Sequence, residues 1–382
     1  MASYATFSPA VYQGVVFFPA KDGTLNAYDA FTGSLKWHQN IGPSIDAADP
    51  TVADGVVYQG NTAGVLYAFH TDSGALLWSA PTGGYIDSST AVAGGVAYQT
   101  ANTNQLLAFD AIRGGPAWTA QTEGNLINGA AVSGGLVYVG TDSSSLLAFR
   151  ATTGELVWSA PVPGTSSCPG AFPLNVVSTP SIWNGVVYVG STSCSLTAFD
   201  ATTGEQLWSA VVDGQISGKG PSLANGVAYV ASEDNYLYAF DLSNGSLLWK
   251  YNLNGDHLIQ AGSQPAIVDG SVYVGITFGY RLYAFALPAG AAQLTVNPSE
   301  GTPGSPVVLA GSGFAPNERI RIYANGLGSN ILTITQTNGV GAFSTSTIIP
   351  PLRAGDHRLL AQGQMSGSRA SATLTVTSSI VP

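Results

Sequence analysis

Short apolar segments alternate with polar, glycine-rich turns along most of the chain. In one unit, apolar and aromatic segments at residues 56–60 and 65–69 are separated by the polar residues 61–64. A short segment at 50–53 precedes them, and another at 75–78 ends the unit. Segments of this length bounded by Gly, Asn, Asp and Ser are typical of antiparallel strands. Each unit therefore predicts one four-stranded antiparallel sheet.

The units share an eleven-residue signature, which consists of Ala, an aromatic residue, four variable residues, Gly, three variable residues and Trp. Six copies end at Trp37, Trp78, Trp118, Trp158, Trp208 and Trp249. They recur every 40 or 41 residues, except for one step of 50. A seventh copy begins at Ala284, but Leu294 stands at the position of its Trp. A period of this length is typical of propellers and solenoids.

A sheet of four short strands cannot bury both of its faces alone. In a radial arrangement each sheet packs on its neighbours, which leaves only short edges. The sequence therefore predicts an all-β chain with a seven-bladed β-propeller over residues 1–288. One Trp per blade at a fixed register favours a packing role for the Trp side chains, and a stacking platform for a ligand is the alternative. The seventh blade has three clear strands, and its fourth would have to be residues 291–296 or come from outside this chain.

The step of 50 residues marks an insertion at residues 163–175, which contains Cys168. The only other cysteine, Cys194, falls in the turn between the second and third strands of the fifth blade. In an up-and-down sheet, the loop that enters the first strand and the turn after the second lie on the same face. A disulfide between the two cysteines is therefore geometrically reasonable and would favour an oxidising compartment. Two separate buried thiols are the alternative.

Residues 289–382 lack the repeat and show alternating apolar and polar positions between turns. About seven short strands in a segment of this size predict a β-sandwich. The segments 298–304 (PSEGTPG) and 311–314 (GSGF) resemble the immunoglobulin-like domains of bacterial surface proteins, although this segment has no cysteine pair. The resemblance implies a spacer or an adhesive module.

The charge and hydropathy of the chain argue against nucleic-acid binding and against a membrane-spanning helix. The net charge is −10, and only 9% of the residues are charged. An acidic chain argues against nucleic-acid binding, which depends on a basic face. No run of about 18 apolar residues is present, so no membrane-spanning helix is expected. The first residues, MASYATFS, lack the layout of a signal peptide, but a trimmed exported chain would look the same.

The signature, in its fuller form AxDxxTGxxxW, resembles the repeats of quinoprotein (PQQ-type) propellers over the first 290 residues. One branch of that family contains PQQ-dependent alcohol dehydrogenases, with eight blades, a calcium ion held by Glu, Asn and Asp, and a disulfide between adjacent cysteines. Seven repeats and no adjacent cysteines depart from that branch. The other branch uses the repeats as a non-catalytic scaffold, as in the lipoprotein of the outer-membrane β-barrel assembly machinery. These departures favour the scaffold branch. The repeat motif itself indicates the fold and not an activity, because its residues build blades.

Candidate chemistry is confined to one place. The sequence has no G-x-S-x-G motif and no His spacing typical of metal ligands, so no catalytic residue is assigned. Loops that lead into the first strands converge on a propeller's channel, and several carry an aliphatic residue before a polar one, as in Ile45-Asp46 and Ile127-Asn128. The candidate ligand-binding residues at this channel mouth are Asp46, Asp49, Asp87, Asn128, Ser217, Lys219 and Gln260. Such oxygens can hold Ca²⁺ or a small ligand, and a water-filled polar channel is the alternative.

We therefore predict a non-enzymatic, secreted or cell-surface protein that binds a protein or glycan partner on the loop face of the propeller, with no cofactor. One alternative is a PQQ- and calcium-dependent dehydrogenase of reduced form, with Asp46, Asp87 and Asn128 as candidate ligands. A second alternative is a structural subunit that self-assembles through the incomplete seventh blade or the C-terminal domain, because an open sheet edge invites strand addition.

Overall fold

The structure is a computed structural model, and it describes the chain in thirteen segments. These are residues 7–46, 48–165, 168, 176–216, 218–253, 264–268, 271–276, 281–286, 292–314, 317–325, 331–338, 341–364 and 368–377. Every regular element among them is a β-strand, so the all-β prediction is confirmed. Within these segments there is no helix long and apolar enough to cross a membrane.

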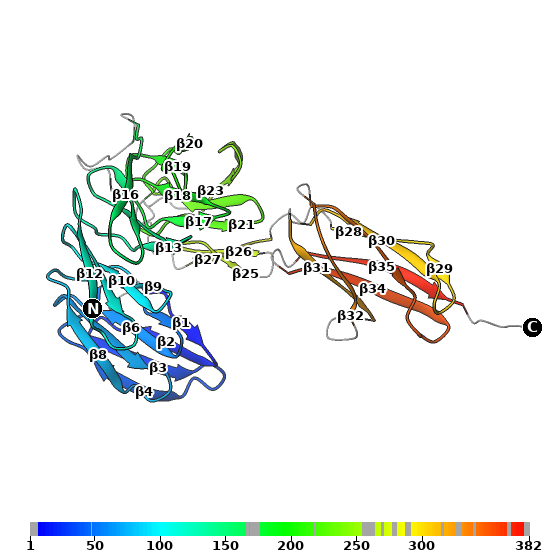
Figure 1. Cartoon of the computed structure of the whole chain (residues 1–382), viewed down its shortest axis with the longest axis horizontal. Coiled ribbons are helices and arrows are strands. Elements are labelled where there is room, and N and C mark those ends of the chain that lie inside the picture. Colours follow the sequence, from blue (N-terminus) through cyan, green and yellow to red (C-terminus); the bar gives the residue numbers. More distant parts are fainter. Residues whose placement is uncertain are drawn as a thin grey trace, which may run out of the picture. The chain divides into compact units, whose positions relative to one another are not determined.

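Six four-stranded sheets follow one another along the chain, and we number them sheets 1 to 6 (Figure 1). Sheet 1 contains β1 (Ala10–Tyr12), β2 (Val15–Pro19), β3 (Thr24–Asp29) and β4 (Leu35–Asn40). Sheet 2 contains β5 (Thr51–Ala53), β6 (Val56–Gly60), β7 (Val65–His70) and β8 (Leu76–Pro81). Sheet 3 contains β9 (Ala91–Ala93), β10 (Val96–Thr100), β11 (Gln105–Asp110) and β12 (Pro116–Gln121).

The next three sheets repeat this plan. Sheet 4 contains β13 (Ala131–Ser133), β14 (Leu136–Gly140), β15 (Ser145–Arg150) and β16 (Leu156–Pro161). Sheet 5 contains β17 (Ser181–Trp183), β18 (Val186–Gly190), β19 (Ser195–Asp200) and β20 (Gln206–Val211). Sheet 6 contains β21 (Ser222–Ala224), β22 (Val227–Ala231), β23 (Tyr236–Asp241) and β24 (Leu247–Asn252). A three-stranded sheet follows, with β25 (Ala266–Val268), β26 (Ser271–Ile276) and β27 (Arg281–Ala286).

Neighbouring strands within each sheet are consecutive in the chain, and the pairing is antiparallel, as in sheet 2. The Ala-aromatic pair of the signature marks a register shift between the third and fourth strands of all six sheets, for example between Ala68 and Phe69. Such a bulge increases the local twist of the strand. The predicted four-stranded antiparallel unit is therefore confirmed, and its signature also encodes a bulge.

In sheets 1 to 5, the Trp that ends the signature is bonded to the following sheet. Trp158 Nε1, in sheet 4, donates to the carbonyl oxygen of Ala201 in sheet 5 at 3.1 Å. The Tyr138 hydroxyl donates to the same oxygen at 3.0 Å. The same pair of bonds joins sheet 2 to 3, sheet 3 to 4 and sheet 5 to 6. Sheet 1, with Phe17 in place of the Tyr, keeps only the bond from Trp37 to the carbonyl of Thr71.

The Gly of the signature completes this contact because it lies against the Trp ring of the preceding sheet. Gly204 has a φ of 73°, and a Cβ at this position would lie 2.6 Å from the ring of Trp158. The glycines at the same position of the other sheets, Gly74, Gly114, Gly154 and Gly245, meet the preceding Trp in the same way. Trp and Gly are thus two halves of one contact between successive sheets.

The Asp of the signature closes the turn between the third and fourth strands. The backbone N–H groups of Thr203 and Thr202 donate to Asp200 Oδ1 at 2.8 and 2.9 Å. These bonds, with that from Thr203 the strongest influence, lower the pKa of Asp200. Asp29 and Asp110 accept bonds from their own turns in the same way. The polar signature residues therefore have structural partners within the repeat.

The first strands of successive sheets lie beside one another, with β1 next to β5, β5 next to β9, β9 next to β13 and β13 next to β17. Since the first strand is one edge of each sheet, the first strands gather on the inside and the fourth strands form the perimeter. The segments that enter the first strands are consequently brought together.

The C-terminal residues form two further sheets. One has the order β28 (Gln293–Asn297), β30 (Pro306–Ser312), β33 (Phe343–Ile348). The other has the order β29 (Glu300–Gly301), β35 (Arg369–Val376), β34 (Gly355–Gly363), β31 (Arg319–Ala324), β32 (Ile331–Gln336). Both contribute to one apolar core, which includes Leu309 of the first sheet and Ile322 and Leu359 of the second.

The structure contradicts one of the two predicted sources of the seventh repeat's fourth strand. The sequence predicts that this strand is either residues 291–296 or a segment from outside this chain. Instead, β28 covers this region and pairs with β30, with Leu294 opposite Gly311. Leu294 is buried in the C-terminal core, so the apolar side chain at the Trp position serves another sheet.

The chain divides into two compact units. The first contains Met1–Ser222, Tyr229–Gln264 and Ile276–Arg281, and the second contains Leu223–Ala228, Pro265–Gly275 and Leu282–Pro382. The division does not fall at a single point of the chain. The boundary between residues 288 and 289 stays a prediction.

Candidate ligand-binding site

A cavity of about 470 Å³ lies where the segments before the first strands meet. Six segments line it: Asp49 before β5, residues 87–90 before β9, 127–130 before β13, Thr179 before β17, 218–219 before β21 and Gln264 before β25. These belong to the loops that were expected to converge on the channel. The volume lies within the range of about 300–1,000 Å³ usual for small-ligand sites.

Two buried glutamines hold two of these segments. Gln59 in β6 donates from Nε2 to the carbonyl of Ala48 at 2.9 Å. Gln99 in β10 donates from Nε2 to Ser88 Oγ at 3.1 Å and accepts from Thr90 Oγ1 at 2.6 Å. Sheets 4 to 6 have valine at this position of the repeat, namely Val139, Val189 and Val230. Sheets 2 and 3 thus use side-chain amides to fix the loops that carry Asp49 and Asp87.

An ion pair beside the cavity connects loops of the first unit that are far apart in the sequence. The Lys219 ammonium group pairs with the Asp49 carboxylate and also donates to Ser8 Oγ at 2.9 Å. The Ser8 N–H donates to Asp49 Oδ1 at 2.7 Å. The three residues precede β1, β5 and β21, which are far apart in sequence. Both ionic side chains are largely buried, with 25% and 13% of their surfaces exposed, so each charge has its compensation nearby.

Asp87 has no such compensation. Its Oδ1 atom is shielded from solvent and has no hydrogen-bond partner within the described segments. Burial raises the pKa of Asp87 to about 6, and the negative charge of Asp46 adds to this rise. Loss of hydration disfavours a carboxylate unless an opposite charge or a donor replaces the water. Asp87 is therefore the carboxylate of the wall that a ligand could stabilise.

Asn128 has a different part in the wall. Its side-chain Nδ2 donates to the backbone carbonyl of Val177 at 2.9 Å. The backbone carbonyl of Asn128 accepts a hydrogen bond from Thr100 Oγ1 at 2.8 Å. The neighbouring Gly129 N–H donates to Thr179 Oγ1 at 3.0 Å. These bonds tie the loop of sheet 4 to sheet 3 and to the loop before sheet 5, so the wall is fixed by side chains from several sheets.

The structure brings together four of the seven candidate residues. Asp49, Asp87, Asn128 and Lys219 line the cavity. Asp46 is exposed and is not one of the lining residues. Ser217 and Gln260 lie outside the described segments.

The predicted pair Ile127-Asn128 differs by one residue from the register of the other loops. The aliphatic residues that anchor the other loops, Ile45, Ile86 and Ile216, are almost fully buried. In sheet 4 the fully buried residue is Leu126, while Ile127 lies in the cavity wall. Two adjacent aliphatic residues made either register possible from the sequence.

Sequence reasoning missed the glutamines and the hydroxyl groups of the wall. Gln59 and Gln99 stand where later repeats have valine, and that difference between aligned repeats was the available signal. Thr90 and Thr179 follow no repeat pattern that would mark them as loop anchors.

Within the described segments, the candidate ligands of the dehydrogenase alternative do not gather into a calcium site. Ca²⁺ takes 6–8 oxygen ligands, whereas no three His, Cys, Asp or Glu side chains within the described segments are placed to hold a metal ion. Of the three candidate ligands, Asp46 lies outside the wall and Asn128 donates its amide to Val177. Asp87 is left without the partners that such a site requires.

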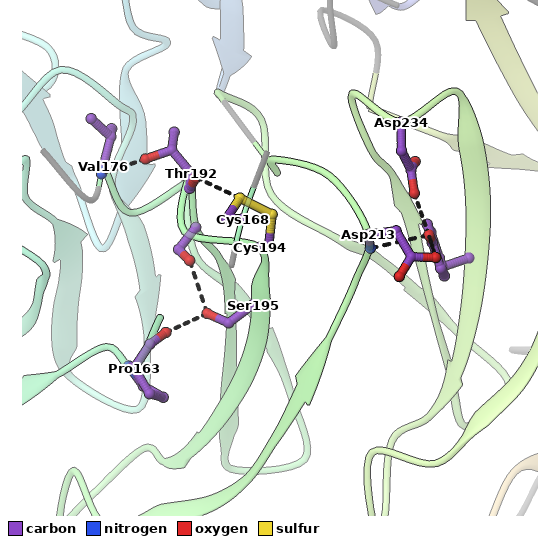
Figure 2. Close-up of a disulfide and its surroundings, with 10 residues drawn as sticks. Pro163, Cys168, Val176, Thr192, Cys194, Ser195, Asp213 and Asp234 are labelled. Atoms are coloured by element: carbon purple, nitrogen blue, oxygen red, sulfur yellow. Dashed lines mark hydrogen bonds between the residues drawn. A yellow bond between two sulfur atoms is a disulfide. The ribbon is translucent and has the colours of Figure 1, made fainter. Parts of the chain in front are cut away.

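A disulfide joins Cys168 and Cys194, with their Cα atoms 5.6 Å apart (Figure 2). Nearby, the Val176 N–H donates to Thr192 Oγ1 at 2.9 Å, and Ser195 Oγ donates to the carbonyl of Pro163 at 2.5 Å. Both ends of the insertion are thereby held against the turn between β18 and β19. The pairing of the two cysteines corresponds to the first of the two alternatives drawn from the sequence.

Comparisons with known proteins give one matching family and two similar solved structures. A family model described as outer membrane protein assembly factor BamB matches residues 21–251 and, in a second match, residues 175–347. The crystal structure of BamB from Moraxella catarrhalis is 17% identical, with a TM-score of 0.61 over 98% of this chain and 98% of that chain. The computationally designed protein Ika8 is 14% identical, with a TM-score of 0.59 over 97% and 96% of the two chains. No curated protein matches the sequence.

Proposed function

Because the chain belongs to the family of the outer membrane protein assembly factor BamB, whose fold is a β-propeller, we propose that it is a non-enzymatic scaffold of the cell envelope that binds a protein partner. The single observation that carries this proposal is the match of the family model to residues 21–251, which include all of sheets 2 to 5. In this proposal sheets 1 to 6 are blades, and β25–β27 begin a seventh.

The use of the signature residues supports a scaffold. In the repeats the Trp bonds to the next sheet, the Gly lies against that ring and the Asp closes a turn. These residues therefore form and pack the blades. What differs between repeats is the set of loops around the cavity, so the loop face is the part free to specify a partner.

We place the partner on that face, around the cavity lined by Asp49, Asp87 and Lys219. The loops there are fixed by hydrogen bonds from Gln59 and Gln99, and a fixed surface loses little conformational entropy on binding. A protein is the favoured partner because the matching family is named for an assembly factor, and a glycan is the alternative class. The disulfide suits an envelope or cell-surface location, since disulfides persist in oxidising compartments. In this view the C-terminal sheets form an immunoglobulin-like spacer.

The test of a non-enzymatic function is a titration with PQQ and Ca²⁺, followed by cofactor absorbance and melting temperature and then by dye-linked oxidation of alcohols and sugars. We expect no stoichiometric uptake and no turnover. Tight uptake together with turnover would show that the chain is an enzyme.

A parallel affinity capture from solubilised envelope proteins of the source organism tests the scaffold role. The expected result is a partner that is retained by the protein but not by heat-denatured protein.

A further inference from the structure

We infer that the cavity is a receptor for one primary ammonium group carried on an aliphatic stem, with Asp87 as its acceptor. A lysine side chain of a partner has this chemistry, and so does a free alkyl amine. The inference deepens the proposed function, since it rests on the loop face as the binding face and names what enters the cavity.

The charges of the wall favour a cation over an anion. Lys219 is already paired with Asp49 and bonded to Ser8, so the positive group of the wall is satisfied. Asp87 makes no ion pair within the described segments, and Asp46 is near enough to influence it. The excess charge at the cavity is therefore negative.

One oxygen of Asp87, Oδ1, also lacks a hydrogen-bond partner within the described segments. Buried polar atoms in proteins are bonded in most cases, and an exception calls for a physical reason. Asp87 Oδ1 is shielded from solvent without a hydrogen-bond partner, and burial raises the pKa of this carboxyl to about 6. Its ionised form is consequently held in an unfavourable place. An ammonium group in the cavity would supply the missing charge.

The remaining wall suits an aliphatic stem. Ile127 and Ala130 line the cavity on the loop before β13, next to the polar residues of the loop before β9. Lysine has this dual character, with an apolar stem and a charged end. A hydrated divalent metal ion lacks the apolar part, and no three acidic, His or Cys side chains within the described segments gather to bind one.

The experiment is calorimetric titration of the full chain with three probes. N-acetyl-lysine methylamide stands for a side chain, putrescine for a free amine, and N-acetyl-norleucine methylamide is the neutral isostere. We expect the two amines to bind and the norleucine probe not to bind. The tighter of the two amines identifies the source of the group. Equal heats for the lysine and norleucine probes would overturn the inference whatever the variants do.

Two variants carry the same change of charge. Asp87→Asn removes the proposed acceptor with little change in shape, whereas Asp72→Asn removes an exposed carboxylate outside the cavity. A single charge-assisted bond of about 1.4 kcal/mol corresponds to a tenfold change in affinity. We therefore expect at least a tenfold loss for Asp87→Asn and no change for Asp72→Asn. A smaller loss in the first variant would contradict the role of Asp87.

The affinity for the lysine probe should also fall as the pH is lowered from 7.5 to 5, because Asp87 takes up a proton across this range. Within the described segments, the other charged residues that line the cavity are Asp49 and Lys219, and Asp46 lies outside the wall but influences Asp87. An alkyl ammonium stays protonated throughout this range. A flat profile would count against Asp87 as the acceptor.

If the Asp87→Asn variant loses the probe but retains an envelope partner, the scaffold function stands with a different contact. If the wild type captures no partner but binds the amines, the scaffold function fails while the cavity site stands.

Discussion

The perimeter of the sheets and the mouth of the channel follow different rules, although sheets 2 to 6 contribute to both. At the perimeter, successive sheets use the same contact: Trp158 bonds to the carbonyl of Ala201 and lies on Gly204, and each neighbouring pair has its equivalent. At the channel mouth the described loops differ from one another. One carries Asp49 in an ion pair, the next carries Asp87, whose Oδ1 atom has no hydrogen-bond partner within the described segments, and a third carries Asn128 bonded to Val177.

The difference teaches how a repeat protein separates stability from recognition. A contact that recurs in every sheet is set by the need to pack sheets side by side. The residue at a position that changes from sheet to sheet is not determined by this packing, so it can serve a specific function. Gln59 and Gln99 belong to this second class, since they replace valine to hold loops in place.

The largest expected effect comes from the perimeter. Gly204→Ala combines the backbone strain of an alanine at positive φ, roughly 1–2 kcal/mol, with overpacking against Trp158 of roughly 1–3 kcal/mol. Gly185→Ala is the matched control, because Gly185 has a similar φ of 77° but nothing within 4 Å of its Cβ position. Urea unfolding should show about twice the loss of stability in Gly204→Ala. Equal losses would mean that the Trp contact does not hold the sheets together.

The disulfide is expected to give the next largest effect. It closes a segment with a sequence separation of 26, for which chain entropy predicts about 3 kcal/mol of stabilisation. Replacing both cysteines by serine should lower the free energy of unfolding by this order without changing the affinity for an amine probe, because neither cysteine lines the cavity. A variant with unaltered stability would show that the insertion is held by its hydrogen bonds alone.

Because two donors share the carbonyl of Ala201, we expect smaller losses of stability that are not additive. Both Trp158 and Tyr138 donate to the carbonyl of Ala201, so each single change to Phe leaves one donor in place. The double variant leaves the carbonyl unpaired, at a cost of roughly 1–3 kcal/mol. A double-mutant cycle should therefore give a coupling energy of about 1 kcal/mol in favour of the pair. Additive losses would indicate that water replaces the donors.

At the channel mouth the expected effect is smaller and opposite in sign. The pKa of Asp87 is raised in the folded protein to about 6, so the folded state holds the proton more tightly than the unfolded state. Stability from this group is present below the unfolded pKa near 3.8 and is lost as the pH rises through 6. Asp87→Asn should raise the melting temperature by about 2 °C at pH 8 and leave it unchanged at pH 3.5. A lower melting temperature at pH 8 would show that the ionised carboxylate has a stabilising partner.

The sequence predicts the perimeter well because the perimeter depends on repetition. The recurring Trp and Gly positions locate the sheets, and one Trp per repeat at a fixed register indicates a packing role for the Trp side chains. The contact between a Trp and the next Gly is visible only in the structure. The channel mouth depends on contacts between distant parts of the chain, such as that between Lys219 and Asp49, which are 170 residues apart. Local sequence patterns cannot predict that pairing. Leu126 and Ile127 are equally apolar, so only packing could choose between them. The strand at Gln293–Asn297 fits two sheets by its pattern, and the C-terminal core decided where it pairs.

The central claim is that recognition belongs to the channel mouth and packing to the perimeter. The most direct test places a photo-crosslinking amino acid at Ser89, which lies in the cavity wall, and separately at Thr202, which is exposed in a perimeter turn. Each protein is illuminated with solubilised envelope proteins, and the crosslinked products are identified. The account predicts one specific partner crosslinked from Ser89 and none from Thr202. The same partner crosslinked from Thr202 and absent from Ser89 would contradict it.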